Sequence, residues 1–110
     1  MELNEYQKQA LTTAGHPDKY KIIYPAMGLG NEAGEVLGKI KKWLRGDDGD
    51  GPMSEERKEA LKGELGDVLW YLAVLAHDLD IPLEDIGKNN VDKLKSRQAR
   101  GKLLGDGDNR

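Results

Sequence analysis

The chain has 110 residues, and its 20 acidic and 17 basic side chains give a formal net charge of −3 without a single cysteine. These totals exclude disulfide bonds and thiolate metal sites, and the charge provides no general attraction for nucleic acid. The longest apolar run, VLWYLAVLA, is too short to span a membrane, and the polar start MELNEYQKQA is unlike a signal peptide. We therefore expect one domain over residues 1–110, working in a reducing cytoplasm.

Two helices are predicted in the N-terminal half. Apolar residues at helical spacing predict the first over about 3–14, ending before Pro17 because the residue that precedes a proline disfavours the helical conformation. The second is predicted from Pro25, a suitable first-turn residue, to Arg45, with Gly46 as its end. The apolar stripe that we expect it to turn toward the core contains Leu29, Ala33, Val36, Leu37, Ile40, Trp43 and Leu44.

Two further helices are predicted in the C-terminal half. After the turn-rich loop DDGDGP, Ser54 is a good N-cap for a helix that runs to about Asp80. The last helix spans about 83–100 and stops at Gly101, followed by the irregular tail GKLLGDGDNR. Because no segment alternates apolar and polar residues as a strand does, the predicted fold class is all-α, a four-helix bundle.

Two acidic pairs occupy matching positions on the second and third predicted helices. The segment GELGDVLWYL repeats the layout of an earlier segment, NEAGEVLGKI, and their acidic residues are Glu32, Glu35, Glu64 and Asp67. At 100° per residue, each pair lies along one edge of the apolar face of its helix. Packed antiparallel through these faces, the two helices could bring all four carboxylates to one seam.

This pattern can be read as a metal site or as ordinary surface. Acid pairs three residues apart arise by chance in so acidic a chain, as at Glu56 and Glu59, and Glu35 has Lys39 one turn further on, as in a surface ion pair. The other three acids have no basic partner at that spacing, and like charges so placed favour a bound cation. Carboxylate oxygens suit Mg²⁺, Mn²⁺ or Ca²⁺, whereas two histidines are too few for a His-rich zinc site.

The fourth predicted helix carries a row of hydrogen-bond donors. Asn90, Lys93 and Arg97 share one face, and such groups suit phosphate oxygens. A basic last turn also stabilises any helix C-terminus, which remains the alternative interpretation. Because Mg²⁺ is commonly held by a few carboxylates together with substrate phosphates, the acidic pairs favour the phosphate interpretation.

These motifs resemble those of a known enzyme family. ExxE at 32–35, ExxD at 64–67 and NxxKLxxR at 90–97 are similar to the MazG-like branch of the all-α nucleoside triphosphate pyrophosphohydrolases, with a likeness over roughly residues 22–110. The resemblance implies hydrolysis of a (deoxy)nucleoside triphosphate to the monophosphate and pyrophosphate, with Mg²⁺ as cofactor and Mn²⁺ as a substitute. It also implies a homodimer or homotetramer with sites at subunit contacts.

The resemblance also assigns roles to residues. The implied metal ligands are Glu32, Glu35, Glu64 and Asp67, with Glu35 and Glu64 as catalytic residues. The expected phosphate contacts are Asn90, Lys93 and Arg97, together with Lys39 and Tyr71, each of which lies between the two acids of its helix. In the expected mechanism, a water activated by Mg²⁺ attacks the α-phosphorus and expels pyrophosphate, while Glu35 orients this water or takes its proton. The candidates for the base pocket are Trp43 and the segment around Tyr20 and Tyr24.

Two other functions remain open at this point. A phosphoribosyl-ATP pyrophosphohydrolase would share the acidic helices and the chemistry but act on another nucleotide. A non-catalytic helical interaction module would use the same apolar faces to bind a partner. Trp70 and His77 lie off the main apolar stripe of the third predicted helix, which indicates either a second packing surface between subunits or a tryptophan partly buried within the monomer.

Overall fold

The computed structural model describes residues 1–110, and all of its regular secondary structure is helical. The elements are α1 (Leu3–Leu11), the short 3₁₀ helix η1 (Asp18–Tyr20), α2 (Ile23–Leu44), α3 (Glu55–Asp78) and α4 (Leu83–Ala99). The all-α class and the four predicted α-helices are confirmed. No helix combines the length and the apolar character needed to cross a bilayer.

α1 ends at Leu11, three residues earlier than predicted. The hydroxyl of Thr12 donates a hydrogen bond to the carbonyl of Gln9 at 2.6 Å, and that of Thr13 donates to Ala10 at 3.0 Å. Such side-chain bonds to the backbone compete with continuation of a helix. The two consecutive threonines therefore end α1 before the proline can.

α2 begins at Ile23, two residues before the predicted start, so Pro25 still lies in the first turn, where a missing N–H costs nothing. The preceding Ile22 has a φ of 70°, which is unusual for a β-branched residue. The Asp78 carboxylate holds this bend, because its Oδ2 lies 2.9 Å from both the Ile22 N–H nitrogen and His16 Nε2. Burial alone would raise the pKa of Asp78, but these two contacts hold the pKa below its usual value.

Three other helix ends have the capping residues predicted from the sequence. Ser54 is the N-cap of α3, and its side-chain oxygen accepts the N–H of Arg57 at 3.1 Å. Gly46 and Gly101 follow α2 and α4 with φ of 94° and 68°, a left-handed conformation that glycine adopts without strain. The predicted capping residues are thus confirmed at three of the helix ends.

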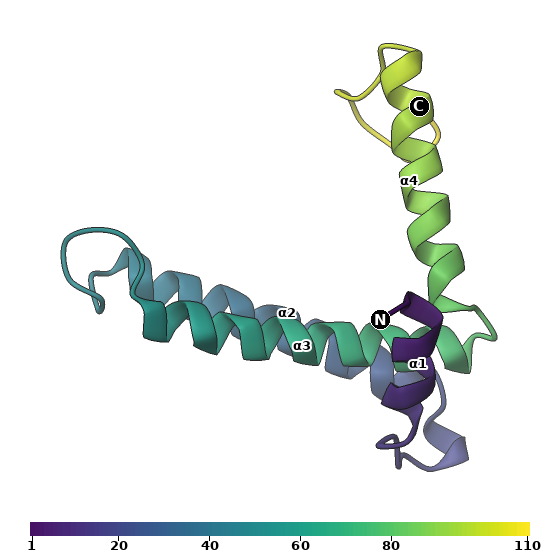
Figure 1. The fold of residues 1–110 in the computed structure, drawn as a ribbon, viewed down its shortest axis with the longest axis horizontal. Coiled ribbons are helices and arrows are strands. Elements are labelled where there is room, and N and C mark those ends of the chain that lie inside the picture. The colour runs from purple at the N-terminus through teal and green to yellow at the C-terminus, as the bar shows by residue number, and fades with distance from the viewer.

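The helices form a hairpin with a projecting arm. α2 and α3 run side by side along most of their length, α1 crosses the far end of this hairpin, and α4 projects from the same corner (Figure 1). The radius of gyration is 17.1 Å. A compact chain of this length would have about 13 Å. A single chain is therefore open in shape, and α4 does not lie along α2 and α3.

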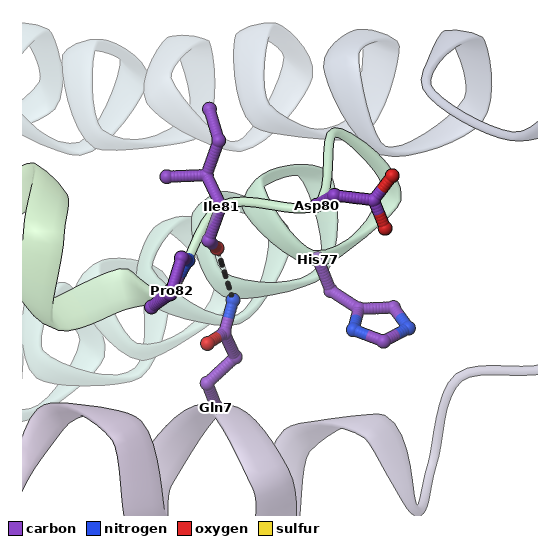
Figure 2. A pocket seen from close by; sticks show the side chains of 5 residues that line it. All are labelled: Gln7, His77, Asp80, Ile81 and Pro82. Carbon is purple, nitrogen blue, oxygen red and sulfur yellow. Dashed lines mark hydrogen bonds between the residues drawn. The ribbon is translucent and has the colours of Figure 1, made fainter.

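The small core lies where α1 crosses α3 and meets the start of α4, and it is formed by Ala10, Ala73, Val74 and Leu83. Gln7 connects these helices: its side-chain amide donates to the carbonyls of Ala73 at 3.1 Å and Ile81 at 3.0 Å, and its Oε1 accepts the N–H of Leu83 at 3.0 Å. Figure 2 shows the bond to Ile81 at the turn between α3 and α4. Gln7 therefore lines the hollow beside this turn with an amide group whose two N–H donors are both hydrogen-bonded.

The apolar stripe predicted to face the core is only partly covered in a single chain. On α2, Leu37 is 69% exposed and Leu44 is 75% exposed, and Leu65 on α3 is also exposed. Only 8 of the 110 residues are buried, and Pro25 is the only one of them on α2. The expectation of a core along the whole of α2 is therefore wrong for the isolated chain, because one neighbouring helix cannot cover the full width of the stripe.

Trp70 packs within the chain. Its indole N–H lies 3.2 Å from the carbonyl of Ala10 and 2.9 Å from the hydroxyl of Thr13, both from the end of α1 and the residues after it. Of the two interpretations drawn from the sequence, partial burial within the monomer is the one observed for this tryptophan. His77, two turns further along α3, is exposed.

Candidate active site

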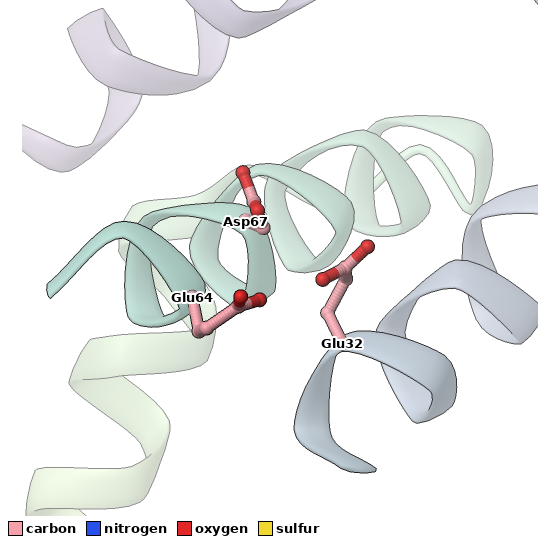
Figure 3. Close-up of side chains that lie close together, drawn as sticks. All are labelled: Glu32, Glu64 and Asp67. Atoms are coloured by element: carbon pink, nitrogen blue, oxygen red, sulfur yellow. The ribbon is translucent and has the colours of Figure 1, made fainter. Parts of the chain in front are cut away.

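Three carboxylates meet where α2 and α3 run side by side. Glu32 extends from α2 toward Glu64 and Asp67 of α3 (Figure 3). One carboxylate oxygen from each residue lies within 4.8 Å of those from the other two. We call these three side chains the acidic cluster. The predicted seam is therefore present, with three of its four expected members.

Glu35 is the member that stays outside. It lies one turn further along α2, is exposed and makes no ion pair. Its position follows from the helical period, which rotates it from Glu32 toward solvent and away from α3. Glu35 is still close enough for its charge to contribute to the raised pKa of Glu32.

The carboxylates of the acidic cluster repel one another. Partial burial, contact with Glu64 and the charges of Asp67, Glu64 and Glu35 raise the pKa of Glu32. Lys39 supplies the nearest positive charge, with its Nζ 3.5 Å from a Glu64 oxygen. The sequence spacing had paired Lys39 with Glu35 instead. One ammonium facing three carboxylates leaves an excess of negative charge at the seam.

A close approach between the helices brings the acidic cluster together. Gly28, one turn before Glu32, lies against the ring of Tyr71, so that a Cβ at this position would overlap the ring. Tyr71 in turn lies one turn beyond Asp67 on α3. Only glycine at position 28 leaves room for this contact.

Replacing Gly28 with alanine is therefore expected to destabilise the protein. The added methyl group must push Tyr71 aside, and overpacking of this kind costs about 1–3 kcal/mol, against a gain of up to about 1 kcal/mol in helix propensity. Gly30→Ala is the matched control, because nothing lies within 4 Å of its added methyl group and it should stabilise α2. Urea unfolding at one fixed chain concentration measures both changes. Equal stabilisation by the two variants would contradict the packing of Tyr71 on Gly28.

Aromatic side chains extend the seam away from the acidic cluster. The ring centroids of Tyr71 and Tyr24 are 6.2 Å apart, and Tyr24 stacks on His16 at 5.3 Å. Interaction with Tyr24, then burial and the charges of Glu32 and Asp67, raise the pKa of Tyr71. The tyrosine hydroxyl beside the acidic cluster therefore keeps its proton and can donate a hydrogen bond.

A cavity of ≈ 460 Å³ opens at the far end of this aromatic run. Four of the residues that line it carry aromatic rings, namely His16, Tyr20, Tyr24 and Trp70. Two of the three base-pocket candidates named from the sequence, Tyr20 and Tyr24, thus share one cavity. Trp43 is absent from it, since it lies near the opposite end of α2.

The three predicted phosphate contacts on α4 lie apart from the acidic cluster. Asn90 and Lys93 line a surface hollow of ≈ 430 Å³ on the projecting arm. Arg97 is buried, and its guanidinium contacts the C-terminal tail. Within one chain, the structure therefore does not bring these residues to the carboxylates.

Sequence reasoning missed Gly28, Tyr24 as a neighbour of Tyr71, and the contact between His16 and Asp78. One signal was available: Tyr24, Gly28 and Glu32 recur every fourth residue and so share one face of α2. The contact between His16 and Asp78 joins residues far apart in sequence, and no local pattern indicates it.

The residues of the acidic cluster fit a divalent cation. All three donors are carboxylates, the ligand type that Mg²⁺ and Mn²⁺ prefer, and burial together with the neighbouring carboxylates raises the pKa of Glu32. Like charges held this close favour a bound cation. Carboxylate donors alone would not favour zinc, which prefers nitrogen and sulfur ligands.

Comparison with known proteins identifies the family of this chain. The model of the MazG nucleotide pyrophosphohydrolase domain matches residues 26–101. This range contains the four acidic residues of the ExxE and ExxD motifs. The Gene 37 protein of Mycobacterium phage L5 is 44% identical over 116 residues, covering 100% of both chains. No solved structure matches the chain. The resemblance read from the sequence is confirmed: the chain belongs to the MazG nucleotide pyrophosphohydrolase domain family.

Proposed function

We propose that this chain hydrolyses a nucleoside triphosphate, ribo- or deoxyribonucleotide, to the monophosphate and pyrophosphate. The observation that carries the proposal is the acidic cluster, in which carboxylates from two helices converge with only Lys39 to balance them. A stable fold gains nothing from such repulsion, so the arrangement is best explained by a bound cation.

Glu32, Glu64 and Asp67 are proposed to hold Mg²⁺ or Mn²⁺, with Glu35 able to join from the next turn of α2. A divalent cation at such a site neutralises phosphate charge and lowers the pKa of the attacking water. Glu35 makes no ion pair and is accessible, so it is our candidate to orient the water and take its proton. Attack at the α-phosphorus then breaks the bond to the β-phosphate oxygen and releases pyrophosphate.

Lys39 and Tyr71 are proposed to contact phosphate oxygens from the two sides of the acidic cluster. Lys39 already lies at its edge through its contact with Glu64. Tyr71 lies at the other edge and keeps a protonated hydroxyl, which can donate to an anionic oxygen. Both groups would stabilise the charge that develops on the departing pyrophosphate.

The base is proposed to occupy the aromatic cavity. Tyr24 links this cavity to Tyr71 and hence to the acidic cluster, so a nucleotide can extend from one to the other along the seam. Its size lies within the usual range for small-molecule sites, and flat rings such as Trp70 and Tyr20 suit a flat heterocycle.

A homodimer or homotetramer is proposed as the active form. The exposed apolar side chains of the hairpin, Leu37 and Leu44 among them, call for a partner surface. A second copy could also supply Asn90, Lys93 and Arg97, which one chain holds away from its own carboxylates. This arrangement would complete the phosphate contacts between subunits.

A panel of nucleotides tests the proposed reaction. Each ribo- and deoxyribonucleoside triphosphate, together with phosphoribosyl-ATP, is incubated with the protein and Mg²⁺ in ¹⁸O-labelled water. We expect label in the nucleoside monophosphate and unlabelled pyrophosphate, because the water attacks the α-phosphorus. Turnover of phosphoribosyl-ATP alone would assign the second enzyme class, and no turnover of any compound would favour the interaction module.

A further inference from the structure

The last nine residues form a closed loop that folds back beside the end of α4 (Figure 1). Arg110 closes it, since its guanidinium donates hydrogen bonds to the carbonyls of Lys102, Leu103 and Gly107. Gly105 and Gly107 have φ of 126° and 84°, which lets the chain reverse in so few residues. The tail has no regular secondary structure, as predicted, and the hydrogen bonds of Arg110 fix its conformation.

This loop places an anion on two predicted phosphate contacts. The Asp108 carboxylate lies 3.3 Å from the Nζ of Lys93 and 3.4 Å from an Nη2 of Arg97. The same Nη2 donates to the Asp108 carbonyl at 2.7 Å. Arg97 is only 4% exposed as a result, although it is the residue on α4 best suited to bind phosphate.

The loop follows residues 26–101, the range that the family model matches. Lys93 and Arg97, the basic pair, lie within that range, whereas Asp108 lies beyond it. Asp108 offers the same chemistry as a phosphate oxygen, an anionic acceptor, but its side chain is 83% exposed, and its carboxylate is held by two ion pairs beside the hydrogen bond to its carbonyl. The Asp108 carboxylate is open to solvent and Lys93 is partly accessible, so a polyphosphate with several anionic oxygens can compete for the two basic groups.

We propose that the C-terminal loop, residues 102–110, is an autoinhibitory segment in which Asp108 occupies the phosphate site of Lys93 and Arg97 and must leave before a triphosphate binds. This inference rests on the proposed function, in which these two side chains hold phosphate. A binding site that is partly occupied by its own chain has an apparent affinity reduced by the occupied fraction. The loop would thereby set the substrate concentration at which the enzyme works.

Asp108→Asn is the test, with Asp106→Asn as matched control because Asp106 lies in the same loop without a charged partner. We expect Asp108→Asn to lower KM by about two- to tenfold with kcat unchanged, as two weak pairs are lost. Arg110→Ala, which opens the loop without touching the basic pair, should change KM in the same direction. A KM that stays unchanged in both Asp108→Asn and Arg110→Ala, or that rises, would overturn the proposal while leaving the hydrolysis itself intact.

Binding of inorganic pyrophosphate separates this inference from the proposed reaction. Calorimetry should show tighter pyrophosphate binding to Asp108→Asn than to the unchanged protein and to Asp106→Asn, whether or not any nucleotide is hydrolysed. If no nucleotide is turned over but this difference is found, the reaction is wrong and the autoinhibitory contact stands. If pyrophosphate binds all three proteins equally, or binds none of them, the contact does not compete with phosphate and the inference fails.

Discussion

Glu64→Gln is expected to reduce nucleoside triphosphate hydrolysis on the order of 100-fold or more while leaving the helical circular dichroism intact. The substitution keeps the size of the side chain but removes one of the three carboxylates of the acidic cluster, and with it a ligand charge for the cation. It also leaves Lys39 without its anionic partner. Steady-state rates at saturating Mg²⁺ and substrate measure the loss.

The matched control is Glu59→Gln, on the same helix. Glu59 is exposed and pairs only with Lys62, at 3.8 Å, so its neutralisation should leave turnover unchanged. Equal loss in both variants would indicate a general effect of charge on α3. Full activity in Glu64→Gln would remove this residue from the site.

Glu32→Gln is expected to raise the melting temperature of the metal-free protein at neutral pH and to abolish any further rise on adding Mg²⁺. The raised pKa of Glu32 means that its charged form is disfavoured in the folded state, so stability is lost as pH rises through that pKa. Glutamine has no charge to lose. In the unchanged protein, Mg²⁺ at a hundredfold excess over Kd should add about 2.7 kcal/mol to the free energy of unfolding.

Two controls sharpen this result. The gain in melting temperature should shrink as the pH is lowered, because Glu32 of the unchanged protein then becomes protonated and uncharged. Glu55→Gln, an exposed residue in the first turn of α3 that pairs only with Lys58, should show no such gain and should keep the response to Mg²⁺. A Glu32→Gln protein that is less stable without metal and still stabilised by Mg²⁺ would contradict the cation site.

The helices could be predicted from the sequence because their signals are local. Apolar spacing, the N-cap at Ser54 and the glycines at 46 and 101 each act within one or two turns, and the structure agrees with them. The early end of α1 also has a local cause, because the hydroxyls of Thr12 and Thr13 bond to backbone carbonyls of its last turn. The direction of α4 depends instead on contacts between distant segments, which no local pattern specifies.

The candidate site also has one part that local sequence patterns predict and another that depends on long-range contacts. Glu32, Glu64 and Asp67 could be predicted because the helical period places them at one edge of two helices that pack together. The helical period also turns Glu35 outward. Its distance from α3 depends on the angle at which α2 and α3 cross, which the sequence does not specify. The burial of Arg97 depends on a loop closed by Arg110, and the sequence offers no sign of it.

Anomalous diffraction from crystals grown with Mn²⁺ tests the central claim most directly. We expect a manganese peak within ligand distance of carboxylate oxygens of Glu32, Glu64 and Asp67, in every copy of the chain, and its loss in crystals of Glu32→Gln. Manganese bound only elsewhere, for instance at the acidic loop around Asp47 and Asp48, or a Lys39 that fills the space between the carboxylates, would contradict the account.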